Sequence, residues 1–290
     1  MRRRALPASV QAWLFMLPAL LVLAVFSFWP VLYGSVLAFT DYSLIRPARW
    51  VGLENFRTIF DNDMFVAGLK NSLLFLLIVP CTQVGAMVLA VLVNNKLPGI
   101  RLFRAAYYVP VVTTVSVVGI MWGFMFHDQG ALNYVLLRLH AINAPVGWLS
   151  DDGIALFAVM FVSLWRGLGW YMVMYLAGLQ GIPSEMQEAA ILDGANVWQR
   201  FWRITVPMLQ PTILVCTLMS VLAALKVYQE VDVLTQGGPL NSTFTALYYA
   251  YDQGFKHLKL PRGLAASFVV SLICIAIALP CLRYLKPRHR

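Results

Sequence analysis

Six long apolar runs dominate this chain and limit what it can fold into. Residues 5–40, 71–95, 105–126, 204–225 and 263–282 contain no aspartate, glutamate, lysine or arginine, and residues 153–184 contain only Arg166. A helix of about 20 apolar residues crosses the roughly 30 Å hydrocarbon core of a bilayer. The chain is 60% hydrophobic and 12% charged, which is outside the composition of soluble domains. The sequence therefore predicts an all-α integral membrane protein with six transmembrane helices.

The first apolar run follows the basic tetrapeptide MRRR, as a signal peptide would. It is longer than the apolar core of a signal peptide, and no small-residue cleavage pattern closes it. We therefore expect it to be retained as a span.

Lysine and arginine predict the orientation of the chain in the membrane. Six spans place both termini on one side, and the segments on that side carry the whole formal net charge of +9. Positive charge in short loops marks the cytoplasmic side. We therefore expect a multi-pass protein of the cytoplasmic membrane with both termini in the cytoplasm. The basic balance is attributed to this topology and not to nucleic-acid binding.

Motifs for catalysis and nucleotide binding are missing from the sequence. It has no GxxxxGK[ST], HExxH, GxSxG or GxGxxG pattern, its four histidines are scattered, and its four cysteines lie singly in the spans. We expect no catalytic residue, no metal site and no cofactor bound by this chain. A secondary transporter or channel is an alternative class, but the span centres hold no carboxylate for ion coupling. A membrane-anchored enzyme would need convergent catalytic residues.

The loop between the fourth and fifth spans predicts two short helices. Ser184 with Gln187, and Asn196 with Gln199, have the spacing of capping boxes at helix starts. Gly194 favours the left-handed conformation that ends a helix. The first helix should therefore stop near residue 193 and the second should start at residue 196.

Small and acidic residues share the first of these two helices. Ala189, Ala190 and Gly194 would form a shallow face, with Glu188 and Asp193 on either side. Small side chains permit close docking, and the acids can pair with arginine or lysine of a partner. A connector that lies on the membrane surface without a partner is the alternative.

The loop resembles the EAA loop of bacterial ABC importer permeases, and the residues that match it are Glu188, Ala189, Ala190, Asp193, Gly194, Ala195, Ile204 and Pro207. Val206 stands where leucine is usual. The segments VGLENF, FRAAYYVPVV and LTQGGPLNSTFT extend the resemblance over nearly the whole chain. They are similar to the maltose, lactose and glycerol-3-phosphate branch of that family.

The resemblance implies a type I ABC importer permease without ATPase activity of its own. It implies a partnership with a second homologous permease, two ATP-binding subunits that use ATP and Mg, and an extracytoplasmic solute-binding protein. It also divides the chain into residues 1–66 (N-terminus, first span and external segment), a permease core at 67–285 with the coupling loop at 183–207, and a tail at 286–290.

The solute pathway is predicted from one charge and from the resemblance. Arg166 lies near the middle of a span, where a charge is costly, so it either lines a cavity or forms a buried ion pair, with Glu230 as a candidate partner. The resemblance implies five further pathway positions, which are Gly167, Trp170, Ser220, Ala224 and Val227.

Trp170 could stack on the apolar face of a sugar ring. Ala224 and Val227 replace polar amides of the maltose-type pattern, so maltose itself is not expected. The predicted cargo is a sugar or oligosaccharide, with glycerol-3-phosphate or a polyol as the alternative. Gly237, Gly238 and Pro239, in the external loop after the fifth span, are expected to touch the binding protein or a gate.

Overall fold

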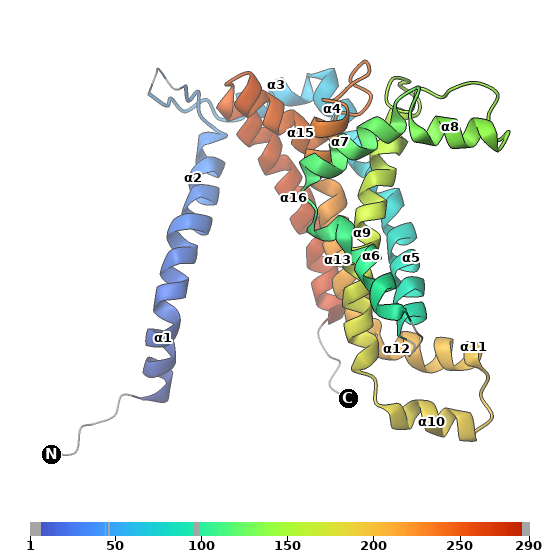
Figure 1. The fold of residues 1–290 in the computed structure, drawn as a ribbon. Helices are drawn as coiled ribbons and strands as arrows, with labels where there is room; N and C mark the ends of the chain where they lie inside the picture. Colours follow the sequence, from blue (N-terminus) through green and yellow to red (C-terminus); the bar gives the residue numbers. More distant parts are fainter. Residues whose placement is uncertain (1–6, 44, 46, 95–98, 286–290) are drawn as a thin grey trace.

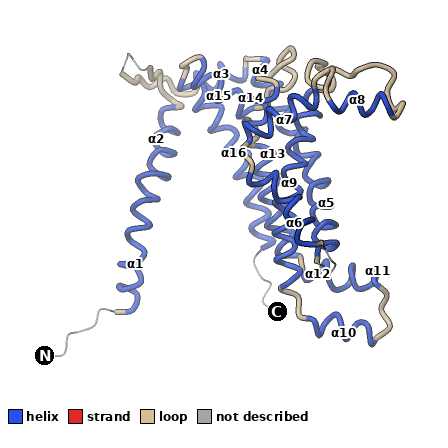
Figure 2. Tube along the Cα trace, in the orientation of Figure 1, coloured by secondary structure: helices blue, strands red, loops and turns tan. Residues whose placement is uncertain are grey.

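The described part of the chain is helical. The computed structural model describes residues 7–43, 45, 47–94 and 99–285; the predicted tail, 286–290, and the basic start of the chain, 1–6, lie outside them. Within the described residues, helices are joined by loops, and Thr40 and Trp50 form an isolated β-bridge (Figure 2).

The described helices fall into longer and shorter ones. Those of nine or more residues are α1 (Ala8–Leu23), α2 (Trp29–Leu37), α4 (Asp63–Leu74), α5 (Ile78–Val93), α6 (Ile100–Val112), α7 (Val115–Phe126), α9 (Ala155–Gln180), α10 (Ser184–Leu192), α13 (Gln210–Leu225) and α16 (Leu260–Leu285). The shorter ones are α3 (Glu54–Phe60), α8 (Ala131–Arg138), α11 (Val197–Arg200), α12 (Val206–Met208), α14 (Gln229–Leu234) and α15 (Ala246–Tyr251). Helical turns Ala24–Phe28, Phe75–Leu77, Phe201–Thr205 and Asp252–Lys256 continue their neighbours.

Length and composition identify the segments that can cross a membrane. Four continuous helices qualify, at Ser9–Leu37, Asp63–Val93, Ala155–Gln180 and Leu260–Cys281. Two further spans are bent pairs of helices, Leu102–Val112 with Val115–Arg138 and Val197–Met208 with Gln210–Leu225. Counting each bent pair as one span gives the six predicted from the sequence.

The third span is not the straight helix that residues 105–126 predicted. Helix α6 ends at Val112, Thr113 and Thr114 are extended, and the segment Val115–Arg138, which begins with α7, leaves at a bend of 103°. Five consecutive β-branched residues occupy positions 111–115, and such residues fit an extended backbone better than a helix. Pro110 removes one helical hydrogen bond just before them. Helix α7 then packs on α14, where Gly119 faces Val233.

The rod formed by α1 and α2 stands apart from the bundle and meets it only near its upper end (Figure 1). Its apolar side chains are exposed; Phe15, for example, is 86% exposed. At the upper end, Gly34 faces Leu264 of α16, and the ring of Phe39 contacts Phe56 at a tilt and Phe268 edge to face. Most of this rod therefore needs lipid or another protein around it.

The bundle core is built on the contact of α5 with α9. Gly85 and Gly169 let neighbouring helices approach, since a β-carbon at Gly85 would press on Leu168 and one at Gly169 would overlap the carbonyl of Tyr107 on α6. Between the same two helices, the buried Tyr175 hydroxyl donates to Gln83 at 2.6 Å. Helices α13 and α16 complete the bundle.

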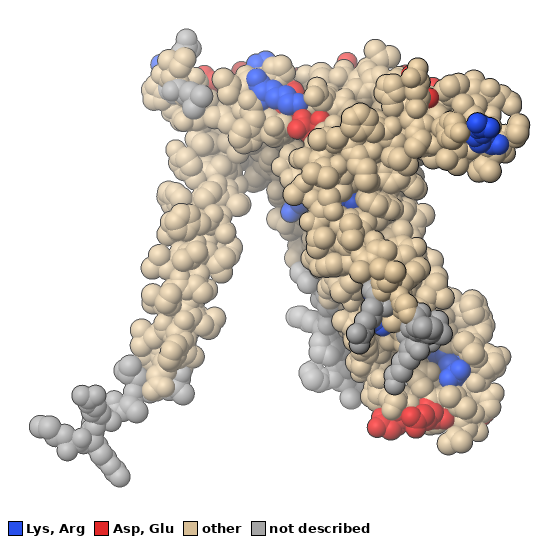
Figure 3. All heavy atoms as spheres, in the orientation of Figure 1, with Lys and Arg blue, Asp and Glu red and all other residues tan. Residues whose placement is uncertain are grey.

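Polar structure is gathered at the two ends of the bundle. Figure 3 shows charged side chains mainly at these ends of the visible face, with mostly uncharged side chains between them. Helices α3, α4, α7, α8, α14 and α15 lie at one end, and α10 and α11 at the other (Figures 1 and 2). A single asparagine organises the loop around α8: the Asn133 side chain donates to three backbone carbonyls and accepts from Val146 and Trp148.

Candidate functional site

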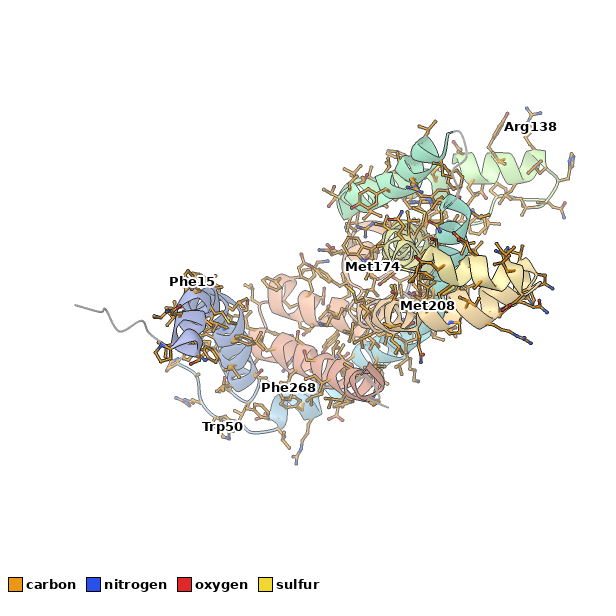
Figure 4. All side chains as sticks on the ribbon, turned by 90° about the horizontal axis from the view of Figure 1, so that it is seen from below. Phe15, Trp50, Arg138, Met174, Met208 and Phe268 are labelled. Carbon is orange, nitrogen blue, oxygen red and sulfur yellow. The ribbon has the colours of Figure 1, made fainter. Side chains whose placement is uncertain are left out.

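A cavity of about 500 Å³ lies inside the bundle. Its walls come from α5, α9, α13 and the segment at residues 226–230, with Val111 of α6. All six residues predicted for the solute pathway line it, namely Arg166, Gly167, Trp170, Ser220, Ala224 and Val227. In the view from below, Met174 of α9 and Met208 of α12 lie in this bundle, whereas Phe15 belongs to the separate rod (Figure 4). The sequence positions therefore converge on one interior space.

Arg166 both lines the cavity and forms an ion pair, which were the two alternatives predicted for it. Its Nη1 atom lies 2.9 Å from Oε1 of Glu230, and the two side chains are 22% and 14% exposed. Both residues also line the cavity. Arg166 is thus a cavity residue whose charge is paired across the space between α9 and α14.

Further polar groups reach the cavity without a partner. The buried Nε of Arg166 and the buried hydroxyl of Ser163 have no hydrogen bond in the described part of the chain. Lys226 lines the cavity and has no ion pair with any described residue. With two cations and one carboxylate, the wall carries one net positive charge. These groups are available to a polar solute or to water.

The apolar part of the wall is equally defined. Trp170 keeps 44% of its surface exposed, whereas the wall residues Ala224 and Val227 are buried. Ser220 is 6% exposed, and its hydroxyl donates to the carbonyl of Thr217 at 2.9 Å. The wall can therefore offer a ring face and charged groups to the same molecule.

Several cavity residues were not predicted. Ser163 lies three positions before Arg166 on α9, so helical spacing could have placed it on the same face. Tyr228 and Gln229 adjoin Glu230 in the segment after α13. Thr82 is one polar residue in an apolar run, and nothing in the sequence distinguishes it from a packing residue.

The loop at the lower end has the two predicted helices. Helix α10 ends at Leu192, with Asp193 at the cap position and Gly194 at φ +78°, so the left-handed stop is confirmed. The box of Asn196 and Gln199 is also confirmed, with bonds of 2.8 and 2.9 Å.

The first predicted capping box is wrong. Pro183 takes the cap position, and Ser184 becomes the first residue of α10 without a capping hydrogen bond. Proline suits an extended cap because its ring sets φ. The side chain of Gln187 instead donates to the hydroxyl of Thr205 at 3.2 Å, which ties α10 to the turn after α11.

The small-residue face is only partly open. Glu188, Ala189, Asp193 and Gly194 are exposed, but Ala190 is 8% exposed and faces inward. Pro207, the last residue of the loop, is exposed in α12. Five residues of the predicted coupling set are therefore accessible to another molecule.

The external loop at residues 235–245 is ordered by its own hydrogen bonds. Gly237 has φ +86° and lies buried against Phe244, and the Thr243 hydroxyl donates to the carbonyl of Gly238 at 2.8 Å. Pro239 is partly buried and Leu240 is exposed beside it. The loop presents a defined shape at the upper end of the molecule.

Above the cavity, Lys256 organises a charged and aromatic cluster. Its ammonium group donates to Asp232 at 2.9 Å and to the hydroxyl of Tyr248 at 2.8 Å, and lies 5.5 Å from the ring centre of Tyr251. Burial alone would lower the pKa of Lys256, but the two hydrogen bonds raise it above its usual range. Burial raises the pKa of Tyr248 and of Tyr249. Among the described residues, no group of three His, Cys, Asp or Glu side chains could hold a metal ion.

Fold and site together define a polytopic helical membrane protein with a solute-sized polar cavity between its spans. The chain belongs to the family described as binding-protein-dependent transport system inner membrane component, whose model matches residues 64–288. Members of this family are transport components and not enzymes. The class predicted from the coupling loop and its flanking motifs is thus confirmed.

Named relatives share nearly the full length of the chain. The lactose transport system permease protein LacF of Rhizobium radiobacter is 33% identical, over 97% of this chain and 95% of the relative. The sn-glycerol-3-phosphate transport system permease protein UgpA of Agrobacterium fabrum is 29% identical, over 97% of each chain.

A solved structure supports the fold. A chain of the bacterial ABC transporter that imports the acidic polysaccharide alginate superposes with a TM-score of 0.83, at 21% identity, over 97% of this chain and 96% of that one. The predicted all-α permease architecture is therefore confirmed.

Proposed function

We propose that this chain is the permease subunit of an ATP-driven importer that moves a sugar or oligosaccharide across the cytoplasmic membrane. The observation that carries the proposal is the convergence of all six predicted pathway residues on one cavity of about 500 Å³. A volume of this size is typical of small-molecule sites. Trp170 supplies an aromatic face, which suits a sugar ring.

A second cargo class is favoured by the charge of the cavity. The cavity wall holds two cations, Arg166 and Lys226, and a single carboxylate, Glu230, so a solute with a phosphate group would gain attraction there. Glycerol-3-phosphate is therefore the alternative cargo, and the relative UgpA bears that solute in its name.

The loop at residues 183–207 is proposed to couple transport to ATP hydrolysis. Glu188 and Asp193 are exposed on and beside α10, at the end of the molecule where Figure 3 shows a group of acidic side chains. These acids can pair with basic side chains of two ATP-binding subunits, which use ATP and Mg. This arrangement places both termini in the cytoplasm, in agreement with the charge distribution of the sequence.

Two further partners complete the proposed assembly. The exposed apolar rod of α1 and α2 can pack against a second, homologous permease as well as against lipid. The upper end, with the loop at Gly237, Gly238 and Pro239, is proposed to receive an extracytoplasmic solute-binding protein. A solved alginate transporter that resembles this chain in fold is in complex with such a periplasmic protein.

The proposal is tested by ATP-dependent uptake of labelled lactose and of labelled glycerol-3-phosphate into proteoliposomes that hold the assembled transporter. We expect uptake of one of these solutes, and loss of that uptake with Glu188→Lys or Gly194→Asp, because both variants change the docking surface without touching the cavity. Both variants should still insert in the membrane but should retain less ATP-binding subunit on purification.

Matched controls exist for both changes. Glu185→Lys reverses another exposed acid of α10, and Gly99→Asp places aspartate at another glycine with positive φ and open space around it. Both controls should keep transport. Normal uptake and normal ATPase association in the Glu188 and Gly194 variants would contradict the coupling role, and uptake of solute without ATP would contradict the transporter class.

A further inference from the structure

A second, smaller pocket lies directly outside the main cavity. It has a volume of about 390 Å³, and its wall comes from the start of α7, from α14 and from α15. Tyr228 and Gln229 belong to the walls of both spaces. The α7, α14 and α15 helices lie at the end of the molecule opposite α10 (Figure 2). The pocket therefore adjoins the main cavity on the side of that end.

The pocket has one aromatic wall. The rings of Tyr228 and Tyr251 have their centres 5.6 Å apart and are inclined by 37°. Both side chains are only partly buried, so their faces are accessible from the pocket. Tyrosine offers a rigid apolar face with a polar edge, which suits a ring that is apolar on one face and hydroxylated around its rim.

Polar groups complete the wall. The hydroxyls of Thr114 and Ser116, the amide of Gln229 and the carboxylate of Asp232 all border the pocket. Asp232 accepts from Lys256 through Oδ1, and its Oδ2 has no partner among the residues that the structure describes. A carboxylate oxygen held in place by a lysine is a strong acceptor for hydroxyl groups.

The charge of the pocket differs from that of the main cavity. Asp232 and Lys256 form an ion pair and cancel. Lys256 lies outside the pocket wall, so the wall itself holds the Asp232 carboxylate, and the ion pair neutralises this charge from outside; the wall of the main cavity carries one positive charge. A neutral polyhydroxylated ring is matched better here than a phosphate.

We infer that this pocket is an outer subsite for one pyranose unit of the transported sugar. The inference rests on the proposed transport function and extends it. Its volume is near the lower limit of about 300 to 1,000 Å³ for small-molecule sites, which fits a single sugar unit. Because the two spaces share wall residues, a disaccharide could occupy both at once.

The test uses one engineered cysteine in each space. Ser116→Cys lies in the outer pocket, and Ala223→Cys lies in the main cavity. Cys81 and Cys281 are replaced by alanine, while Cys216 and Cys274 are buried and remain. The assembled transporter in detergent reacts with 2-sulfonatoethyl methanethiosulfonate in the presence of lactose, methyl β-D-glucopyranoside or glycerol-3-phosphate, and the labelling rate is measured.

We expect lactose and the methyl glucoside to slow labelling at Ser116→Cys at least threefold, and glycerol-3-phosphate to leave it unchanged. Protection at Ala223→Cys without protection at Ser116→Cys would overturn the outer subsite and leave the transport function standing. Equal protection of Ser116→Cys by glycerol-3-phosphate would overturn recognition of a sugar ring. No protection by any probe at Ala223→Cys would count against the proposed function itself.

A second pair of variants tests the aromatic wall through uptake. Tyr251→Leu removes the ring, and Tyr251→Phe keeps it while removing the hydroxyl. Loss of one stacking contact should raise the KM for lactose uptake in Tyr251→Leu by about 3- to 10-fold. The kcat should stay within about twofold, and Tyr251→Phe should behave as the native protein. A fall in kcat with unchanged KM in Tyr251→Leu would show a structural role and overturn the assignment of this residue to the subsite.

Discussion

The ion pair of Arg166 and Glu230 joins α9 to α14 across the main cavity, and its energetic weight can be estimated. At the 2.9 Å separation of the atoms, the two charges lie within a few Å of each other. Unit charges about 4 Å apart attract by about 4 kcal/mol at an effective dielectric constant of 20. The side chains keep 22% and 14% of their surface exposed and border an open cavity. Because water there screens the pair and desolvation offsets part of the attraction, we expect a coupling energy of about 2 kcal/mol.

The coupling is measured with a double-mutant cycle of Arg166→Met, Glu230→Gln and the double variant. Each single variant leaves one charge without its partner and should lower the free energy of unfolding. The double variant leaves none, so it should lose about 2 kcal/mol less than the sum of the single losses, which is about a 30-fold difference in the equilibrium constant. The assay titrates the purified permease in detergent micelles with sodium dodecyl sulfate.

The control for this cycle is Lys226→Met. Lys226 lines the same cavity but has no ion pair among the described residues, so its removal should cost less than either single variant. Losses that add within about 0.5 kcal/mol would refute the reasoning, because independent sites show that behaviour. A loss of unfolding free energy in the double variant that exceeds the sum of the two single losses would refute it as well.

Two other changes have defined outcomes. Gly169→Ala would press a methyl group on the backbone carbonyl of Tyr107 and should destabilise the protein by about 1 to 3 kcal/mol. The control, Gly123→Ala on α7, meets open space and should be neutral or stabilising. Both are measured by the titration with sodium dodecyl sulfate. Lys256→Met should destabilise by about 0.5 to 1 kcal/mol, because the side chain is 38% exposed and solvent screens its pair. Since the folded-state pKa of Lys256 is raised, this loss should be constant from pH 6 to 9 and should shrink as the pH rises beyond the unfolded-state pKa of about 10.4. Melting curves of the native protein, of Lys256→Met and of the control Lys259→Met at pH 8 and pH 11 check this. A loss of stability in Lys256→Met that is equal at both pH values would contradict it.

Much of the fold could be predicted because the membrane imposes a length and a composition on every span. Local chemistry was predictable where one residue dominates a conformation, as Gly194 does at the end of α10. The pairing of Arg166 with Glu230 was open to prediction because few charged residues lie within or near the ends of the spans. These features depend on single residues and on the solvent, and not on distant packing.

The errors have two causes, which are local residues that the prediction did not weigh and packing between distant segments. Residues 105–126 are apolar enough for one span, but Pro110 and the β-branched run at 111–115 end α6 and bend the segment at Thr113, and α7 then packs against α14. Ser184 has the spacing of a cap, but Pro183 occupies that position. Ala190 belongs to the small-residue face by sequence and is buried by the fold. Thr82 reaches the cavity only because α5 packs on α9.

The break after α13 explains how polar groups reach the centre of an apolar bundle. Helix α13 ends at Leu225, and the following residues, from Lys226 to Tyr228, line the main cavity. Irregular backbone at membrane depth is tolerated where it borders a cavity or is buried in protein. Here the carbonyl of Val227 is satisfied by the hydroxyl of Thr245 at 2.7 Å. The break therefore leaves this carbonyl paired.

The short helix α14 follows the same break, and its residues line both the main cavity and the outer pocket. Glu230 and Asp232 are two positions apart, and a helix turns by about 200° over that distance. Glu230 accordingly pairs with Arg166 at the main cavity, while Asp232 pairs with Lys256 beside the outer pocket. A displacement of α14 would alter both ion pairs at once. The charged groups beside both spaces therefore depend on the position of one six-residue helix.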